Sequence, residues 1–178
     1  NRKIGIASVR AGNVIGGGDW SEARIIPDCI NSIKNNKTIL LRKPLATRPW
    51  QHVLEPLSGY LLLAKRLYLD PSKVNGSYNF GPGIKSNKTV EEIARYIIRI
   101  FGKGEISLKD NSDISHEATL LHLNCDKANN ILNWFPTWNY NETIEITIKW
   151  YEEFFKGINP IRITEDNIEN FMLKNSYD

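Results

Sequence analysis

Three consecutive glycines, Gly16 to Gly18, constrain this chain more than any other stretch. Glycines in a row do not belong inside a regular helix or strand. They follow a short run rich in β-branched residues, which predicts a buried strand over residues 3–10. We therefore expect a strand that opens into a loop of bare backbone. Two interpretations stay open: the loop lets backbone amides approach a ligand at the carboxyl end of a parallel strand, or it is only a tight turn.

Length and composition indicate a globular protein. The chain has 178 residues, of which 41% are hydrophobic, so it can bury the core of one domain, with or without a small appendage. No apolar run approaches the ~20 residues needed to span a bilayer, and the first residues do not resemble a signal peptide. Cys29 and Cys125 lie far apart in predicted helices. This pattern predicts a reduced, cytoplasmic protein without a membrane partner.

The net charge of +3 hides an asymmetry between the two halves of the sequence. Residues 1–89 contain 14 Lys and Arg against 5 Asp and Glu, whereas residues 90–178 contain 9 against 15. A basic first half suits an anionic partner such as a phosphate, although an uneven solvated surface would look the same. Nucleic acid is not the expected partner, because the sequence has no Lys/Arg run, zinc-finger spacing or single-strand-binding motif.

Hydrophobic periodicity predicts strands that alternate with helices, and hence an α/β protein with a mainly parallel sheet. Only about half of such a fold is present. Prolines predict a loop over 43–49, and Thr89 with Glu92 forms a capping box at the start of a helix that Gly102 ends. The predicted strands are 3–10, 38–41, 50–54, 77–80, 106–108 and 119–123, and the predicted helices are 24–34, 55–67, 90–101, 125–132, 141–155 and 165–174.

Two arginines are candidates for phosphate contacts. Arg48 lies between a predicted loop and a strand, where a guanidinium can bind phosphate oxygens in a bidentate manner. Arg24 precedes a helix whose first backbone amides favour an anion. The alternative for both is an ordinary surface arginine.

No metal site or catalytic triad is expected. His52 and Glu55 are spaced like ligands one helical turn apart, but Pro56 makes the helix begin there, so their geometry is poor. His116-Glu117 misses the HExxH pattern because Leu120 occupies the place of the second histidine. No Gly-x-Ser-x-Gly nucleophile elbow occurs. The aromatic residues late in the chain are expected to be core residues rather than base-stacking platforms; these are Trp134, Phe135, Trp138, Trp150 and Tyr151.

Three segments in the first third of the chain carry a recognisable pattern. They are Arg10-Ala11-Gly12-Asn13-Val14-Ile15-Gly16-Gly17-Gly18-Asp19-Trp20, Arg24-Ile25-Ile26-Pro27-Asp28 and Arg48-Pro49-Trp50-Gln51-His52-Val53-Leu54-Glu55-Pro56-Leu57-Ser58-Gly59-Tyr60. Together they resemble the CDP-glucose 4,6-dehydratases, a family of the extended short-chain dehydrogenase/reductase group that modifies nucleotide sugars. Later segments are consistent with it, namely Tyr78-Asn79-Phe80-Gly81, Asp126-Lys127-Ala128 and Leu132-Asn133-Trp134. The resemblance thus extends over nearly the whole chain.

The resemblance implies the last part of a Rossmann-like parallel sheet followed by a small α/β substrate-binding lobe. It also implies a lyase that uses NAD as a recycled hydride carrier. Such an enzyme oxidises the sugar at C4, removes water across C5 and C6, and returns the hydride to C6. The substrate would be CDP-glucose, and the product would be CDP-4-keto-6-deoxyglucose, a precursor of deoxysugars in bacterial surface polysaccharides. Members of the family often form homodimers.

The resemblance assigns roles to residues near the cofactor and the phosphates. Ala11 would meet the nicotinamide carboxamide of NAD. Asn13 and Arg48 would hold the pyrophosphate of the substrate. Arg24 and Ile25 would lie near the phosphates and the base.

It also assigns residues to the nucleoside. The strand edge formed by Leu41 and Arg42 would face the cytosine. Glu117 would face the ribose. Many relatives carry Arg at the position of Ile114, so that ribose-side contact departs from the family pattern, with His116 as its substitute.

Two motifs of the family do not occur in this sequence. It has neither the Gly-x-x-Gly-x-x-Gly dinucleotide fingerprint nor a Tyr-x-x-x-Lys pair, and in the family both precede the strand that opens this chain. We therefore expect residues 1–178 to be a C-terminal portion, inactive alone, that carries the nucleotide-sugar-binding lobe, with the dinucleotide-binding half and the catalytic Tyr and Lys upstream. The alternatives are another nucleotide-sugar dehydratase or epimerase, and a stand-alone nucleotide-binding module.

Overall fold

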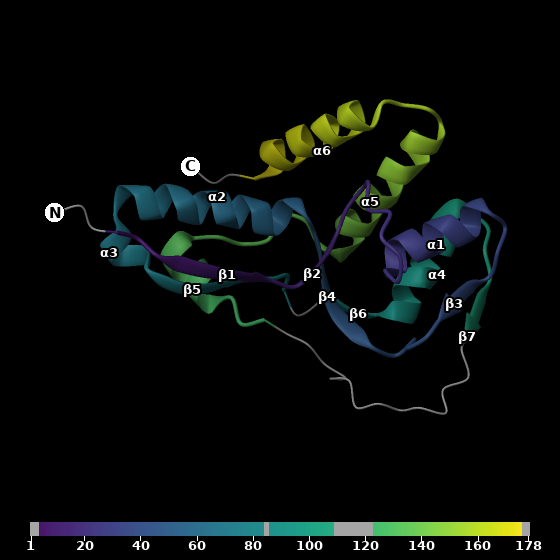
Figure 1. The fold of residues 1–178 in the computed structure, drawn as a ribbon, viewed down its shortest axis with the longest axis horizontal. Coiled ribbons are helices and arrows are strands. Elements are labelled where there is room, and N and C mark those ends of the chain that lie inside the picture. The colour runs from purple at the N-terminus through teal and green to yellow at the C-terminus, as the bar shows by residue number, and fades with distance from the viewer. Residues whose placement is uncertain (1–3, 84–85, 109–122, 176–178) are drawn as a thin grey trace.

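The computed structural model describes residues 4–83, 86–108 and 123–175, in which strands and helices alternate (Figure 1). The elements are β1 (Ala7–Ala11), β2 (Asn13–Ile15), α1 (Ile25–Lys34), β3 (Ile39–Leu41), β4 (Thr47–His52), α2 (Leu54–Leu69), α3 (Pro71–Val74), β5 (Gly76–Phe80), β6 (Asn87–Thr89), α4 (Val90–Phe101), β7 (Ile106–Leu108), η2 (Ala128–Leu132), α5 (Tyr140–Phe155) and α6 (Pro160–Lys174). Every predicted helix is present, although residues 128–132 wind as a π-helix. The strand predicted over 119–123 falls almost wholly outside the described residues.

The strands form three small sheets. β1 and β5 are parallel, with Ala7 opposite Gly76 and Ala11 opposite Phe80. In the second sheet β4 lies between a parallel β2 and an antiparallel β6, and β3 pairs in parallel with β7. Most strand pairs in the described part of the chain are therefore parallel, which confirms the predicted α/β class.

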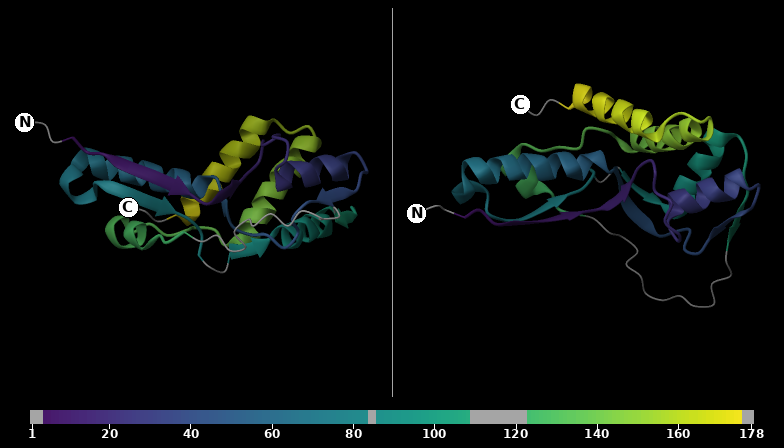
Figure 2. Two further views of the ribbon diagram at one scale, coloured as in Figure 1. Left: turned by 60° about the horizontal axis from the view of Figure 1, so that its bottom comes forward. Right: turned by 45° about the horizontal axis from the view of Figure 1, so that its top comes forward.

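The molecule is elongated and has two cores (Figures 1 and 2). At one end α2 lies along β1 and β5, and a small core gathers around Leu63, Phe80 and Trp134. At the other end α1, α4, β3 and β7 form a larger core with α5, which includes Ile30 and Ile148. The sheet of β2, β4 and β6 lies between the two ends.

A single residue, Gly12, joins the first two sheets. Its amide donates to the Phe80 carbonyl on β5 at 3.3 Å. A Cβ atom on Gly12 would lie 3.1 Å from the Pro49 carbonyl on β4. Residues 7–15 therefore run as one nearly continuous extended segment that contacts both sheets.

The buried strand predicted over residues 3–10 is wrong in two respects, because β1 starts later and none of residues 4–10 is buried. Ile4 and Ile6 are 79% and 72% exposed, and β1 begins only at Ala7, where its register with β5 begins. Val9 is 39% exposed, and within the described residues β1 pairs with β5 alone. The apolar pattern does mark a strand, but these side chains are not covered in this structure.

The loop predicted over 43–49 is also partly wrong, because β4 begins at Thr47. Pro49 lies at the last pair of the β4–β6 ladder, and the β2–β4 ladder starts with the next residue. A missing N–H costs least at such a position, so a proline is tolerated in this strand.

The helix ends follow capping chemistry. Thr89 and Glu92 form the predicted capping box, with N–H to oxygen distances of 3.0 and 2.7 Å, and Gly102 ends α4 with a φ of 66°. Helix α6 starts five residues earlier than predicted. Its start is fixed by the Asn159 side chain, which accepts the Ile161 amide at 2.9 Å, and by a proline at the first helical position.

The aromatic residues late in the chain lie in the core, with one exception. Trp134, Trp138, Trp150 and Tyr151 are at most 5% exposed, as predicted, whereas Phe135 is 51% exposed. Phe135 follows Trp134, which belongs to the smaller core, but Phe135 itself does not belong to that core.

The glycine run is shaped by helix α5. A Cβ atom on Gly17 would lie 2.0 Å from Cγ of Trp150, so the indole ring occupies the space of any side chain there. Gly18 has a φ of 78°, which favours glycine. These two residues form a tight turn, whereas Gly16 lines the pocket described below. The turn interpretation is thus confirmed for Gly17 and Gly18, and the approach of a ligand to the backbone of Gly16 stays a prediction.

Aromatic side chains secure the chain that follows this turn. The buried hydroxyl of Tyr151 donates to the Asp19 carbonyl at 2.7 Å. Trp20 packs edge-on against the Tyr151 ring at 5.2 Å and also contacts Phe154 and Phe155. Residues 16–20 are therefore held in place against α5.

We expect Gly17→Ala to lower the free energy of unfolding by roughly 1–3 kcal/mol, because the added methyl group has to displace the packed Trp150 ring. Urea unfolding followed by tryptophan fluorescence measures the change. Gly83→Ala is the matched control, since a Cβ atom there meets nothing within 4 Å. Equal stability of the two variants would contradict this account of the turn.

Candidate functional site

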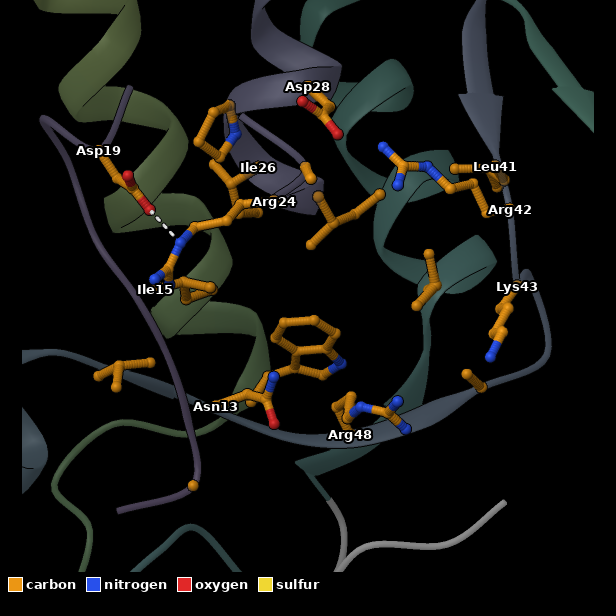
Figure 3. Close-up of a pocket in the computed structure, with 18 of the residues that line it drawn as sticks. Asn13, Ile15, Asp19, Arg24, Ile26, Asp28, Leu41, Arg42, Lys43 and Arg48 are labelled. Carbon is orange, nitrogen blue, oxygen red and sulfur yellow. Dashed lines mark ion pairs between the residues drawn. The ribbon is translucent and has the colours of Figure 1, made fainter. Parts of the chain in front are cut away.

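A pocket of about 680 Å³ opens where β2, β4, the start of α1 and the end of β3 converge (Figure 3). Its lining is rich in charge, with Arg24, Arg42, Lys43 and Arg48 against Asp19 and Asp28. The pocket therefore has an excess of positive charge, which suits an anionic ligand.

Strand alternation builds one side of the pocket. Asn13 pairs with Trp50 in the β2–β4 ladder, and Arg48 lies two residues before Trp50, so these three side chains share one face of the sheet. The Trp50 indole is anchored by a hydrogen bond from Nε1 to the Lys88 carbonyl at 2.9 Å. Arg48 donates to the Thr47 carbonyl at 2.8 Å. In Figure 3 the Asn13 and Arg48 side chains lie next to each other at one end of the pocket.

The start of α1 forms a second side. Arg24 precedes the helix and no side chain caps it, so the amides of Ile25 and Ile26 are left at the positive end of the helix dipole. The Arg24 guanidinium lies 3.8 Å from the Asp19 carboxylate and remains largely exposed, so this ion pair is weak. The sequence predicted this arrangement of a basic side chain beside free helix amides.

The end of β3 and the first turn of α1 form the opposite end of the pocket. Arg42 and Asp28 point toward each other there (Figure 3). Burial raises the pKa of the Asp28 carboxyl above its usual value, whereas a hydrogen bond from the Ala23 amide and the charge of Arg42 act in the opposite direction. Leu40 also lines this end and is 55% exposed, which gives it an apolar edge.

The pocket brings together seven of the nine residues to which the resemblance assigned contacts. Ala11, Asn13, Arg24, Ile25, Leu41, Arg42 and Arg48 all line it. His116 and Glu117 lie outside the described residues. Leu41 lines the pocket, but its side chain is only 2% exposed and belongs to the core. The exposed side chain at this part of the pocket is that of its neighbour Leu40.

Sequence reasoning did not single out Asp28, Leu40 or Lys43, which also line the pocket. A signal was available for two of them. Lys43 directly follows Arg42 in the sequence, and Asp28 lies one residue after the proline that marks the first turn of a helix. An exposed leucine carries no such signal.

His52 and Glu55 have structural partners rather than a shared ligand. Burial lowers the pKa of His52 to about 4, its Nδ1 accepts the Leu54 amide at 3.3 Å, and its ring packs edge-on against Trp138. Glu55 is 1% exposed and accepts the amides of Thr137 and Trp138 at 2.9 and 2.8 Å. Among the residues that the structure describes, no three His, Cys, Asp or Glu side chains cluster as metal ligands would.

Two further observations concern residues outside the pocket. Cys29 is buried in α1 and Cys125 is partly exposed, and both are free thiols. None of the helices in the described ranges combines the length and the apolar character that crossing a membrane requires.

Comparisons with known proteins agree with this fold and this sequence pattern. No family model matches the chain. The chain is 44% identical to CDP-glucose 4,6-dehydratase of Salmonella typhimurium, over 95% of its own length and 47% of that protein. It is 26% identical to UDP-glucose 4-epimerase of Mycoplasma pneumoniae, over 83% of its length and 45% of that protein. The chain therefore spans about half the length of the curated relatives it matches.

A solved structure gives the same result. The crystal structure of dTDP-glucose 4,6-dehydratase from Bacillus anthracis in complex with NAD matches with a TM-score of 0.67 and 25% identity, over 83% of this chain and 44% of that one. The resemblance inferred from the motifs is thus confirmed, and the α/β fold is that of the Rossmann-like nucleotide-sugar enzymes.

The buried Glu55 carboxyl makes stability depend on pH. Burial raises its pKa from 4.5 to about 7, although the two amide hydrogen bonds act against this. Between these values the folded state holds the proton more tightly than the unfolded state, so stability falls as pH rises. We expect the free energy of unfolding of the unaltered chain to fall by about 3 kcal/mol relative to Glu55→Gln between pH 4.5 and pH 7.

Urea unfolding at a series of pH values measures this difference. Glu165→Gln removes an exposed carboxylate from α6 and should follow the unaltered chain at every pH. If the free energies of unfolding of the unaltered chain and of Glu55→Gln change in parallel with pH, Glu55 has the same pKa in the folded and unfolded states, and the prediction is wrong.

Proposed function

We propose that this chain is the substrate-binding portion of an NAD-dependent CDP-glucose 4,6-dehydratase, which converts CDP-glucose to CDP-4-keto-6-deoxyglucose for deoxysugar synthesis. The observation that carries the proposal is the convergence on one basic pocket of seven residues to which the resemblance assigned contacts, from β1, β2, α1, β3, β4 and the junctions between them. The 44% identity to a CDP-glucose 4,6-dehydratase supports the substrate. A cytoplasmic location, inferred from the two free thiols, and a homodimer, implied by the resemblance, belong to the same proposal.

Arg48 and Asn13 would hold the pyrophosphate. A guanidinium donates paired hydrogen bonds to phosphate oxygens, and an amide nitrogen adds a third donor from the neighbouring strand. Arg24 and the first amides of α1 would add positive charge on a second side. The sugar would then extend from the phosphates toward the carboxyl end of β1.

Ala11 is the residue of this chain that would meet the cofactor. It lies at the carboxyl end of β1, lines the pocket and is followed by Gly12, so its backbone fits a contact with a planar carboxamide. NAD supplies a hydride carrier when bound. The residues of this chain orient the sugar beside that carrier and keep the phosphates fixed, so that C4 and C6 of the sugar stay within reach.

The remaining machinery would come from outside these 178 residues. The sequence has no Tyr-x-x-x-Lys pair, and its relatives are about twice as long. Apolar side chains on β1 and α2 are exposed, among them Val9, Leu57 and Leu61. A sheet of only two parallel strands is rarely stable by itself, since parallel sheets are usually larger and covered on both faces. These features support a dinucleotide-binding half that continues the sheet beyond β1 and brings the catalytic Tyr and Lys.

Titration calorimetry of the chain with CDP, UDP and dTDP tests the proposal. We expect CDP to bind best, and Arg48→Ala to weaken CDP binding roughly 10- to 100-fold, because charge-assisted hydrogen bonds contribute roughly 1.5–3 kcal/mol each. Arg162→Ala, which removes an arginine from the exposed face of α6, should leave the affinity unchanged. A preference for UDP or dTDP would overturn the named substrate, and unchanged CDP binding by Arg48→Ala would overturn the phosphate site.

A further inference from the structure

We infer that Asp28 selects the cytosine base by accepting a hydrogen bond from its exocyclic N4 amino group, with Arg42 beside it donating to the neighbouring acceptor of the ring. This inference rests on the proposed function, which places a nucleotide in the same pocket. It adds a specificity-determining carboxylate to that pocket.

The position of Asp28 in the pocket supports this role. The phosphate-binding candidates Arg48 and Asn13 lie at one end, and Asp28 and Arg42 lie at the other (Figure 3). A nucleotide with its phosphates on Arg48 would direct its base toward the Asp28 end. The partly exposed Leu40 lines this end and offers an apolar contact for a planar ring.

The chemistry of the side chains matches one base better than the others. Along its pairing edge cytosine presents an N4 amino donor and then the N3 acceptor, whereas uracil and thymine present the O4 acceptor and then the N3–H donor. An ionised carboxylate only accepts hydrogen bonds, and a guanidinium only donates them. Asp28 would therefore accept from N4 of cytosine while Arg42 donates to N3. With uracil the same arrangement would place the carboxylate against O4, and two acceptors form no hydrogen bond. Carboxylates that accept from cytosine N4 are a known mode of base recognition.

The carboxylate of Asp28 has acceptor capacity left for a ligand. Its two oxygens offer about four lone-pair directions. Burial raises the pKa of this carboxyl, whereas the Ala23 amide and the charge of Arg42 act in the opposite direction and favour its ionised form. Half-burial in the first turn of α1 fixes the side chain while leaving it on the pocket surface. A purely structural role in the helix turn would give no reason for base preference, so base preference separates the two roles.

The test is calorimetric titration of CDP and UDP into the unaltered chain, Asp28→Asn, Asp28→Ser and Arg48→Ala. We expect the unaltered chain to prefer CDP roughly 10- to 100-fold. The side-chain amide or hydroxyl that replaces the carboxylate in the two Asp28 variants both accepts and donates, so the preference should fall to about threefold or less. Arg48→Ala should weaken both nucleotides equally and keep their ratio. Asp166→Asn, the same charge change on the exposed α6, should also keep the ratio.

The outcomes separate this inference from the proposed function. A CDP preference that survives in both Asp28 variants, or an unaltered chain that binds CDP and UDP equally, would overturn the role of Asp28 and leave the nucleotide site standing. An unaltered chain that binds neither nucleotide would overturn the proposed site and the base selection with it. If Asp28→Asn fails to fold by circular dichroism, Asp28→Ser decides the question.

Discussion

The packing of helix α5 on the glycine turn is the contact on which the rest of the structure depends. The Trp150 ring occupies the space of a Gly17 side chain, and the Tyr151 hydroxyl holds the Asp19 carbonyl. Together they fix the chain between the end of β2 and the start of α1. Only because this turn is fixed does the amino end of α1 face the same space as the Asn13 and Arg48 side chains of the central sheet. A core contact thus determines where the charges of the pocket lie.

The pocket separates two kinds of recognition onto different elements. The main phosphate contacts are proposed for strands β2 and β4, with support from the amino end of α1, whereas base contacts are proposed for Asp28 in the first turn of α1 and Arg42 at the end of β3. Strand side chains have a fixed register, which suits the placement of charge. Residues at the end of a strand or in the first helical turn can be substituted without disturbing the hydrogen bonds between paired strands. The dTDP-glucose 4,6-dehydratase of Bacillus anthracis, 25% identical, shares this fold, and such a division is compatible with different bases on one scaffold.

Local patterns predicted most of the fold, and their failures have physical causes. The capping box at Thr89, the amphipathic face of α1 and the Gly102 stop depend on neighbours in sequence, so they could be predicted. The exposure of Ile4 and Ile6 depends on what covers β1, which a hydrophobic pattern does not specify. Among the pocket residues, the motifs and the resemblance identified those on the strands, at their ends and at the start of α1. Leu40 and Asp28 were missed because their importance arises from the approach of β3 to α1, two elements whose contact no local pattern encodes.

The single-residue junction at Gly12 limits how this fold can vary in length. Successive side chains on a strand point to opposite faces, so one inserted residue between β1 and β2 would turn Asn13 and Ile15 away from the pocket. Gly12 contacts both β4 and β5, so the backbone has no room there for an extra residue. Ser21 and Glu22 are exposed, lie outside the helices and strands and do not line the pocket, so residues added between them would project into solvent. Length variation among homologous chains should therefore accumulate before α1 and be rare at the junction of the two sheets.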